Sequence, residues 1–337
     1  MNAALCSCPM GEFDLIERYF KRPAKRAVLG IGDDCALLQS PVGTHMAISS
    51  DMLVEGRHFF ADVDPRTLGH KALAVNLSDL AACGAEPIAF TLALALPQID
   101  EAWLAAFAQG LLALADTHGC ELIGGDTTRG PLNICITVFG SVPAPAGKSQ
   151  ALLRSGAQPG DDIYVSGHLG DARLALEALR GKFHLPPTLL KRARQRLEEP
   201  SPRIALGLAL RGLASAAMDL SDGLVGDIQH LLKASKVGAT LHTAVALDLL
   251  AARTHVDWPS AGINDEAALT CVLSGGDDYE LLFTAPPIAA AALQVAALKS
   301  ATPIHCIGRI NAAPGLQLLD ENGRELPMHF TSFDHFS

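Results

Sequence analysis

The 337-residue sequence has no excess of positive charge and no long uninterrupted apolar segment. Its formal net charge is −10, from 26 Lys+Arg against 36 Asp+Glu, which argues against nucleic-acid binding as its main function. The longest charge-free apolar stretch, "PIAFTLALALPQI" (87–99), is too short and too interrupted by proline to span a bilayer. The N-terminus shows no basic region followed by an apolar run, so no signal peptide is expected. These absences predict a soluble cytoplasmic protein without nucleic-acid or membrane partners.

Closely spaced cysteines are also scarce. Of the eight cysteines only Cys6 and Cys8 are neighbours, and both fall in a segment expected to be a loose tail. The other six are scattered, mostly in apolar runs. This distribution predicts buried free thiols in a reducing compartment rather than a disulfide framework or a cysteine metal site.

Two common phosphate-binding motifs are missing. The "AGKSQ" segment contains Gly-Lys-Ser, but Val142 stands where a Walker loop requires its first glycine. The "GIGDDC" segment begins like a dinucleotide fingerprint, but Cys35 occupies the place of the third glycine. The sequence therefore supports neither a P-loop nor a Rossmann nucleotide site.

Alternating strand and helix patterns indicate an α/β or α+β protein, and the length suggests two domains. Strands are expected at 46–56, 88–97, 120–130 and 132–142, and helices at 12–20, 65–84 (ending at Gly84) and 100–119 (beginning at Asp100 and ending at Gly119). A second series of strands and helices starts at 160–167. The Pro/Gly/Ser-rich segment 143–150 is the best boundary candidate. We expect a loose tail at 1–11, an N-terminal domain at 12–147 and a C-terminal domain at 148–337.

Six short turns combine aspartate with glycine or serine, and most of them follow an apolar segment. They lie at 31–34, 49–51, 76–79, 123–126, 218–223 and 274–278. Carboxylates and hydroxyls suit Mg²⁺, and glycine lets backbone amides approach phosphate oxygens. The pattern therefore favours nucleotide phosphates held through metal ions. The alternative is that each turn is structural, with Asp219 and Asp222 serving only as caps of the helix at 223–235.

Read together, these stretches resemble the thiamine-monophosphate kinases of the aminoimidazole-ribonucleotide-synthetase-like ATP-binding superfamily. The matching segments follow the family's order from residue 11 to 336: "GEFDLIERYF", "GIGDDCALL", "SSDMLVEGRHF", "KALAVNLSDLAACGAEP", "LIGGDTTRGP", "LLRSGAQPGDDIYVSG", "PSPRI", "MDLSDGL", "LSGGDDYELLF" and "FDHF". "VEGRHF" and "GGDDYEL" distinguish these kinases from the rest of the superfamily.

The resemblance implies an ATP-dependent enzyme that converts thiamine monophosphate into thiamine diphosphate, the last step of that biosynthesis. It implies direct in-line transfer of the γ-phosphoryl group, with several Mg²⁺ ions and no proton-transfer base. It further implies a two-domain α/β (α+β) fold of the aminoimidazole-ribonucleotide-synthetase type and a homodimer, with the N-terminal domain contributing to a dimer-interface β-structure.

Residue roles carry over by motif. As metal ligands the resemblance implies Asp34, Ser49, Ser50, Asp51, Asp79, Asp126, Asp219 and Asp222. As ATP contacts it implies Gly125, Asp126, Arg154 and Ser221. As thiamine-phosphate contacts it implies His58, Asp277 and Phe333. Asp33, next to Asp34, would point the other way in an extended segment, so it is expected to brace the turn or a group behind the metal ligand. Ser50 replaces the family's usual threonine and Asp277 its frequent glutamate, so the Asp277 carboxylate is one methylene shorter than usual.

Each of these residues also has a plain structural alternative. Taken alone, His58 is a structural histidine beside a turn, Arg154 a surface arginine, Asp277 a turn residue and Phe333 a docking hydrophobe. The basic run 191–199 ("KRARQRLEE") is expected to be a solvated helix face without a catalytic role.

Three other functions compete with the kinase hypothesis. One is another enzyme of the superfamily, such as aminoimidazole ribonucleotide or selenophosphate synthetase, although for the latter only Cys6 and Cys8 offer a reactive N-terminal thiol. The second is an aspartate-nucleophile phosphatase, which uses carboxylates two residues apart, whereas Asp219 and Asp222 are three apart. The third is a non-catalytic ATP- and metal-binding module.

Overall fold

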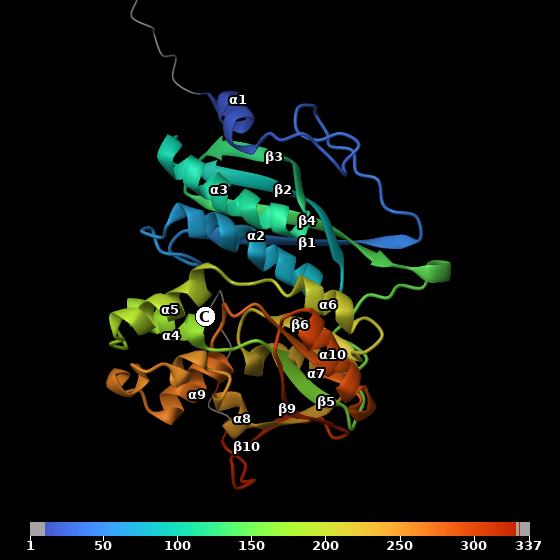
Figure 1. Cartoon of the computed structure of the whole chain (residues 1–337), viewed down its shortest axis with the longest axis vertical. Helices are drawn as coiled ribbons and strands as arrows, with labels where there is room; N and C mark the ends of the chain where they lie inside the picture. The colour runs from blue at the N-terminus through green and yellow to red at the C-terminus, as the bar shows by residue number, and fades with distance from the viewer. Residues whose placement is uncertain (1–10, 328–329, 331–337) are drawn as a thin grey trace, which may run out of the picture. The chain divides into compact units, whose positions relative to one another are not determined.

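A computed structural model describes residues 11–327 and 330 of the chain (Figure 1). Contacts group the residues into two compact units. The first unit comprises the chain up to Ser40, Ile48–Asn76 and Pro87–Phe139, and the second comprises Pro41–Ala47, Leu77–Glu86 and the chain from Gly140. The domain limits expected from the sequence stay predictions, and the units are described separately below.

The N-terminal part contains a four-stranded sheet with strand order β1-β4-β2-β3. Its elements are α1 (Glu12–Leu15), the π-helical turn η1 (Ile16–Phe20), β1 (Thr44–Val54), α2 (Pro65–Ala82), β2 (Glu86–Leu96), α3 (Glu101–His118), β3 (Glu121–Arg129) and β4 (Asn133–Pro143). Strands β2 and β3 pair in parallel, with Leu92 opposite Gly125 and Ala93 opposite Asp126. The register therefore places the Gly-Asp segment of β3 along its neighbour in the sheet.

Helices α2 and α3 lie side by side (Figure 1) and approach each other closely at two glycines. A Cβ at Gly69 would overlap the backbone of Phe107, and one at Gly110 would overlap the carbonyl of Arg66. Only glycine permits this approach, because any larger residue would force the two helices apart.

Local sequence signals locate the helix ends correctly. The Asp100 carboxylate accepts hydrogen bonds from the amides of Ala102 (2.9 Å) and Trp103 (3.1 Å), and Gly119 ends α3 in a left-handed conformation. Gly84, two residues after α2, also has a positive φ of 62°. These predictions are confirmed because caps act within a single turn of chain.

The C-terminal part contains a six-stranded mixed sheet with order β10-β7-β9-β5-β8-β6. Its elements are η2 (Pro145–Gly147), β5 (Asp162–Ser166), α4 (Asp171–Leu179), α5 (Pro187–Glu198), α6 (Ile204–Leu210), β6 (Ala216–Leu220), α7 (Leu224–Ser235), β7 (Gly238–His242), α8 (Thr243–Leu247), η3 (Ala251–Thr254), η4 (Trp258–Ala261), α9 (Asp265–Ser274), β8 (Glu280–Ala285), η5 (Pro287–Ala289), α10 (Ala290–Lys299), β9 (Ile304–Asn311) and β10 (Gly315–Leu319). Both parts mix strands and helices, as the predicted α/β (α+β) class requires.

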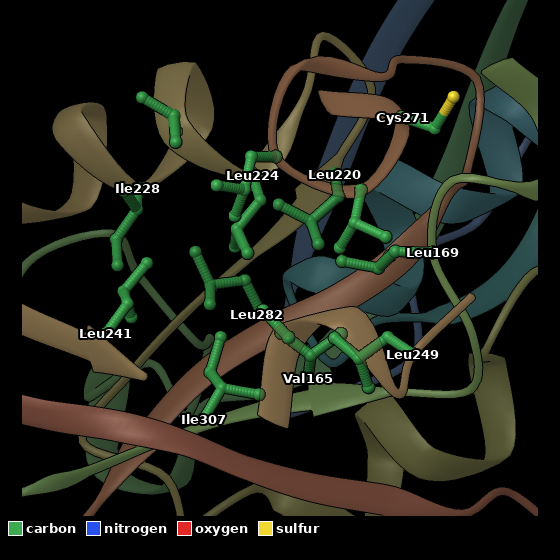
Figure 2. Close-up of a cluster of buried hydrophobic side chains, with 14 of the residues drawn as sticks. Val165, Leu169, Leu220, Leu224, Ile228, Leu241, Leu249, Cys271, Leu282 and Ile307 are labelled. Carbon is green, nitrogen blue, oxygen red and sulfur yellow. The ribbon is translucent and has the colours of Figure 1, made fainter. Parts of the chain in front are cut away.

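A hydrophobic core of the second unit contains buried residues of this sheet and of helices that include α4, α5, α7 and α9. Figure 2 shows Leu220 at the end of β6 and Leu224 at the start of α7 among its buried side chains. These two leucines bracket the Ser-Asp-Gly segment 221–223 and anchor both of its ends in the core.

The cysteine prediction is only partly correct. Each of the six cysteines in the described residues is free, but only Cys120 and Cys271 are buried. Cys35 and Cys306 are exposed, because Cys35 lies in a surface loop and Cys306 in a strand segment that faces solvent. Cys6 and Cys8 lie outside the described residues. Within the described chain, no helix is both long and apolar enough to cross a membrane.

Candidate active site

The first unit contains a cavity of about 940 Å³. The helical segment from Glu12 to Lys21, the loop from Ile31 to Leu38 and parts of β2 and β3 line it. Three residues predicted to bind metal or ATP, Asp34, Gly125 and Asp126, share its wall although the chain separates them by about 90 residues. Ser49, Ser50 and Asp51 are not among the residues that line it.

Gly125 is required by the sheet. Its φ is +148°, and a Cβ there would overlap the carbonyl oxygen of Leu92 on the neighbouring strand. A side chain at this position would therefore displace β3 and the exposed Asp126 that follows it. The glycine thus fixes the backbone that presents Asp126 to the cavity.

The two adjacent aspartates of the 31–34 turn are joined by a hydrogen bond. The Asp33 carboxylate accepts the backbone N–H of Asp34 at 2.9 Å, which is the local bond expected of a residue that braces a turn. Both aspartates are exposed and both line the cavity. The turn itself is flanked by a short bridge between Leu29 and Leu37.

The Ser-Ser-Asp segment of β1 divides between the two faces of the strand, since neighbouring side chains alternate. The Ser50 hydroxyl bonds the carbonyl of Ile136 (3.1 Å) and the hydroxyl of Thr137 (2.9 Å), both on β4. Asp51 is held by its own backbone N–H, which donates to the buried side chain of Asn76 on α2 at 3.1 Å. The Ser50 hydroxyl is therefore engaged within the sheet, and Ser49 and Asp51 share the opposite face.

His58 closes the turn after β1. Its Nδ1 accepts the backbone N–H of Val54 at 3.0 Å, and the backbone N–H of His58 donates to the Val54 carbonyl. Because Nδ1 is an acceptor here, Nε2 carries the proton of the neutral ring. The half-buried imidazole thus has a structural bond on one nitrogen and a donor on the other.

In the second unit the pairing of β6 with β8 brings two of the predicted site loops together. Antiparallel register places Leu220 opposite Glu280 and Asp219 opposite Leu281. Beyond the strands the contact continues, because the amide of Asp277 donates to the Ser221 carbonyl and that of Tyr279 to the Leu220 carbonyl, both at 2.8 Å. Segments 219–223 and 275–279 therefore lie side by side.

Asp227 organises the 221–223 segment. One oxygen of its buried carboxylate accepts the amides of Ser221 (3.0 Å), Asp222 (3.0 Å) and Gly223 (3.2 Å). Burial raises the pKa of Asp227 to about 6, the three amides act in the opposite direction, and the Asp222 carboxylate adds to the rise. Asp227 is not among the site residues predicted from the sequence, although an acidic residue in the first turn of a helix is a recognisable signal.

Asp79, Asp219 and Arg154 form a second group around Cys83. The buried Asp219 carboxylate accepts the hydroxyl of Ser78 at 2.8 Å, which supplies the partner that a buried carboxylate needs. Burial first, and then the charges of Asp79 and Asp219, raise the pKa of the Cys83 thiol, while Arg154 lowers it. The Ser78–Asp219 bond joins two of the predicted site segments, 76–79 and 218–223.

The basic run at 191–199 is not wholly a solvated face, so this prediction is wrong in part. Arg196 on α5 donates to the Glu280 carboxylate at 2.8 Å, and its side chain is only 23% exposed. Its neighbour Arg194 instead pairs locally with Glu198. The helix pattern did not reveal this because Glu280 is 84 residues away.

Comparison with known proteins identifies the family. The chain matches the model "AIR synthase related protein, N-terminal domain" over residues 32–142 and its C-terminal counterpart over residues 158–321. It is also 46% identical over 332 residues to the thiamine-monophosphate kinase of Salmonella typhimurium, covering 97% of this chain and 98% of that protein. The chain belongs to the thiamine-monophosphate kinase family. The resemblance and the fold class predicted from the sequence are thereby confirmed.

Solved structures of the thiamine-monophosphate kinase family share the fold. The enzyme from Stenotrophomonas maltophilia has a TM-score of 0.79 at 42% identity, over 89% of this chain and 92% of that one. AaThiL, solved in complex with AMPPCP and TMP, has a TM-score of 0.75 at 27% identity, over 88% and 89% of the two chains. The prediction that the protein is a phosphotransferase is confirmed at the level of this family.

The predicted metal ligands of this kinase family member do not form a ready-made cage. Within residues 11–327 and 330, no three His, Cys, Asp or Glu side chains are grouped closely enough to hold a metal ion. Mg²⁺ nevertheless fits the donor chemistry, because it is usually bound by one or two carboxylates together with substrate phosphates and water. Asp34 and Asp126, two exposed carboxylates on one cavity wall, meet that requirement. Phe333 lies outside the described residues.

Proposed function

We propose that this protein transfers the γ-phosphoryl group of ATP directly to thiamine monophosphate, giving thiamine diphosphate in the last step of its biosynthesis. The observation that carries the proposal is the near full-length similarity to thiamine-monophosphate kinases at 46% identity. The cavity that gathers Asp34, Gly125 and Asp126 adds local support. So does the structural similarity to AaThiL, a protein solved with AMPPCP and TMP.

Mg²⁺ is part of the proposal. When bound, it neutralises negative charge on the phosphate groups that must approach each other. Asp34 and Asp126 hold it at the cavity, and Gly125 lets the backbone come close to the ATP phosphates. Further Mg²⁺ ions would take their ligands from Ser49, Ser50, Asp51, Asp79, Asp219 and Asp222. For Ser50 we propose the backbone carbonyl oxygen as the metal ligand, because the hydroxyl is hydrogen-bonded to β4.

The remaining site residues bind and orient the two substrates. Arg154 and Ser221 contact ATP, where the guanidinium offsets phosphate charge. His58 donates from Nε2 to the phosphate of thiamine monophosphate, since Nδ1 is occupied by Val54. Asp277 and Phe333 contact the same substrate. The attacking oxygen belongs to an already ionised phosphate, so no side chain has to remove a proton.

The protein acts as a homodimer in the cytoplasm under this proposal. Support for an assembly comes from β1, where Ile48 and Met52 point to the same side of the strand and are 62% and 52% exposed. Two large apolar side chains on one sheet face favour coverage by another protein surface. Light scattering of the purified protein tests the dimer.

The activity is tested by incubating the purified protein with Mg²⁺-ATP and thiamine monophosphate and measuring thiamine diphosphate by chromatography. We expect one thiamine diphosphate for each ADP formed. Parallel reactions with selenide or with formylglycinamidine ribonucleotide test the other superfamily activities. ATP binding without thiamine diphosphate formation would instead support a non-catalytic module, and a trapped phospho-aspartate would support the phosphatase alternative.

Cys35 provides a direct probe of the cavity. Its thiol is exposed and lines the cavity next to Asp34. We expect iodoacetamide to alkylate Cys35 readily at pH 8, and Mg²⁺ with the ATP analogue AMPPCP to slow this reaction about tenfold or more by covering the thiol. Peptide mass spectrometry measures the rate at each cysteine.

Two internal controls accompany this measurement. Burial raises the pKa of both Cys120 and Cys271 to about 12, so neither should react in the folded protein. Cys306 is exposed in the other unit and should react equally with and without the nucleotide. Equal protection of Cys35 and Cys306 would argue against nucleotide binding in the cavity.

A further inference from the structure

The loop between α9 and β8, residues 275–279, has an unfavourable backbone conformation at two positions. Asp277 (φ 68°) and Tyr279 (φ 50°) both lie in the left-handed region, although neither is glycine. This region is costly for residues with a Cβ, and more so for a bulky one such as tyrosine. Contacts with the rest of the unit must therefore hold the loop in shape, and such strain is concentrated at functional sites.

Asp278 provides one of these contacts. Asp278 lies between the two strained residues in the sequence, and its side chain is buried. Both of its carboxylate oxygens accept the backbone N–H of Gly170 at 3.0 Å. The amides of Asp277 and Tyr279 point the other way and donate to the carbonyls of Ser221 and Leu220. The loop is thus fixed on one side to the start of α4 and on the other to the 219–223 segment.

Glu280, the residue after the loop, is bound still more tightly. Its carboxylate is fully buried and accepts four hydrogen bonds. Arg203 donates from Nε (2.6 Å) and Nη2 (2.5 Å), Arg196 from Nη2 (2.8 Å) and Ser166 from Oγ (2.6 Å). One negative charge between two guanidinium groups forms a charge cluster that fixes the end of the loop to α5 and to the residue preceding α6.

We propose that Glu280 and Arg196 are positioning residues for phosphoryl transfer. They hold the 275–279 loop in the shape that presents Asp277 beside the 219–223 segment. The inference rests on the proposed function, in which Asp277 contacts thiamine monophosphate and Ser221 contacts ATP. Neither Glu280 nor Arg196 is assigned a substrate contact, so each acts through the loop. Because displacing a reacting group by about 1 Å lowers rates about a hundredfold, a loosened loop should impair transfer.

Hydrogen–deuterium exchange tests the hold on the loop without any turnover. In Glu280→Gln and Arg196→Met we expect the peptide containing residues 275–281 to exchange at least about tenfold faster than in the unmodified protein. The matched control is Arg194→Met, which removes the same group two residues away on α5 and breaks only the local pair with Glu198. Its exchange in 275–281 should be unchanged.

Steady-state kinetics tests whether fixing the 275–279 loop is needed for phosphoryl transfer. We expect Glu280→Gln and Arg196→Met to lower kcat/KM for thiamine monophosphate about tenfold or more, with Arg194→Met within about twofold of the unmodified enzyme. Arg196→Lys, which keeps the positive charge, should restore most of the loss. Combining Glu280→Gln with Asp277→Asn should cost no more than the worse single change, because both act through one carboxylate.

Several results would overturn the inference. The first is that Glu280→Gln unfolds faster, while hydrogen exchange in residues 275–281 and kcat/KM are unchanged. Glu280 and Arg196 would then contribute only to stability. The second is that the double variant loses kcat/KM by the product of the losses in Glu280→Gln and Asp277→Asn. If Glu280→Gln does not fold, hydrogen–deuterium exchange and kcat/KM are both measured on Arg196→Met, whose side chain is partly exposed. An unmodified protein that makes no thiamine diphosphate contradicts the proposed function, and the exchange result then decides the positioning claim by itself.

Discussion

Asp126→Asn is expected to lower the rate of thiamine diphosphate formation by about a hundredfold or more while leaving the melting temperature unchanged. Asp126 is an exposed carboxylate on the cavity wall, on the strand position that follows Gly125. Asparagine keeps the shape of the side chain but removes the negative charge that attracts Mg²⁺. The fold should tolerate the change, because an exposed substitution of this kind usually alters stability by no more than about 0.5 kcal/mol.

A dependence on Mg²⁺ separates loss of a ligand from other causes. Asp126→Asn should need a higher Mg²⁺ concentration for half-maximal rate, whereas Asp62→Asn, an exposed residue that does not line the cavity, should match the unmodified enzyme. Steady-state assays across a Mg²⁺ titration and a thermal melt give the required numbers. Full activity of Asp126→Asn at limiting Mg²⁺ would rule out a metal role for this residue.

Asp227→Ala is expected to lower the free energy of unfolding by about 3 kcal/mol or more, since it leaves three amides in and beside the core without an acceptor. This is a large part of the roughly 5–15 kcal/mol that stabilises most domains. The same change releases the 221–223 segment, which holds Ser221 and Asp222, so activity should fall as well. Urea unfolding followed by circular dichroism measures the stability.

Two further variants calibrate that measurement. Asp227→Asn retains an amide oxygen that can accept from the backbone, so its loss of stability should be clearly smaller. Asp248→Ala removes a carboxylate that is 83% exposed on the same unit and should change stability by no more than about 0.5 kcal/mol. If Asp227→Ala were as stable as Asp248→Ala, the three hydrogen bonds to Asp227 would not be important for the fold.

The buried Glu280 carboxylate explains why the prediction for the basic run at 191–199 is wrong in part. Spacing along one helix shows which residues share a face, but it does not show what packs against that face. Arg194 finds its partner four residues away, whereas Arg196 finds one on β8. A local sequence pattern therefore predicts the contact of Arg194 and not that of Arg196.

The cavity of the first unit likewise combines motifs that are visible in the sequence with contacts that only the fold sets. The glycine and aspartates of the 31–34 and 123–126 turns are visible as motifs, and their chemistry suggests a phosphate site. That Asp34 and Asp126 line the same cavity depends on the placement of β3 beside β2, with Leu92 opposite Gly125. It also depends on α1 and on the loop from Ile31 to Leu38, which line the same cavity.

By itself the sequence determined the family, the mixed α/β class and the ends of α3, because ordered motifs and helix caps are local features of the chain. The tertiary structure alone decided which partners the acidic residues contact. It joined Ser78 to Asp219 across 141 positions and Arg196 to Glu280 across 84. Strand register and helix packing set these distances, and no local pattern encodes them. A buried carboxylate must find a partner, but only the fold determines which one it finds.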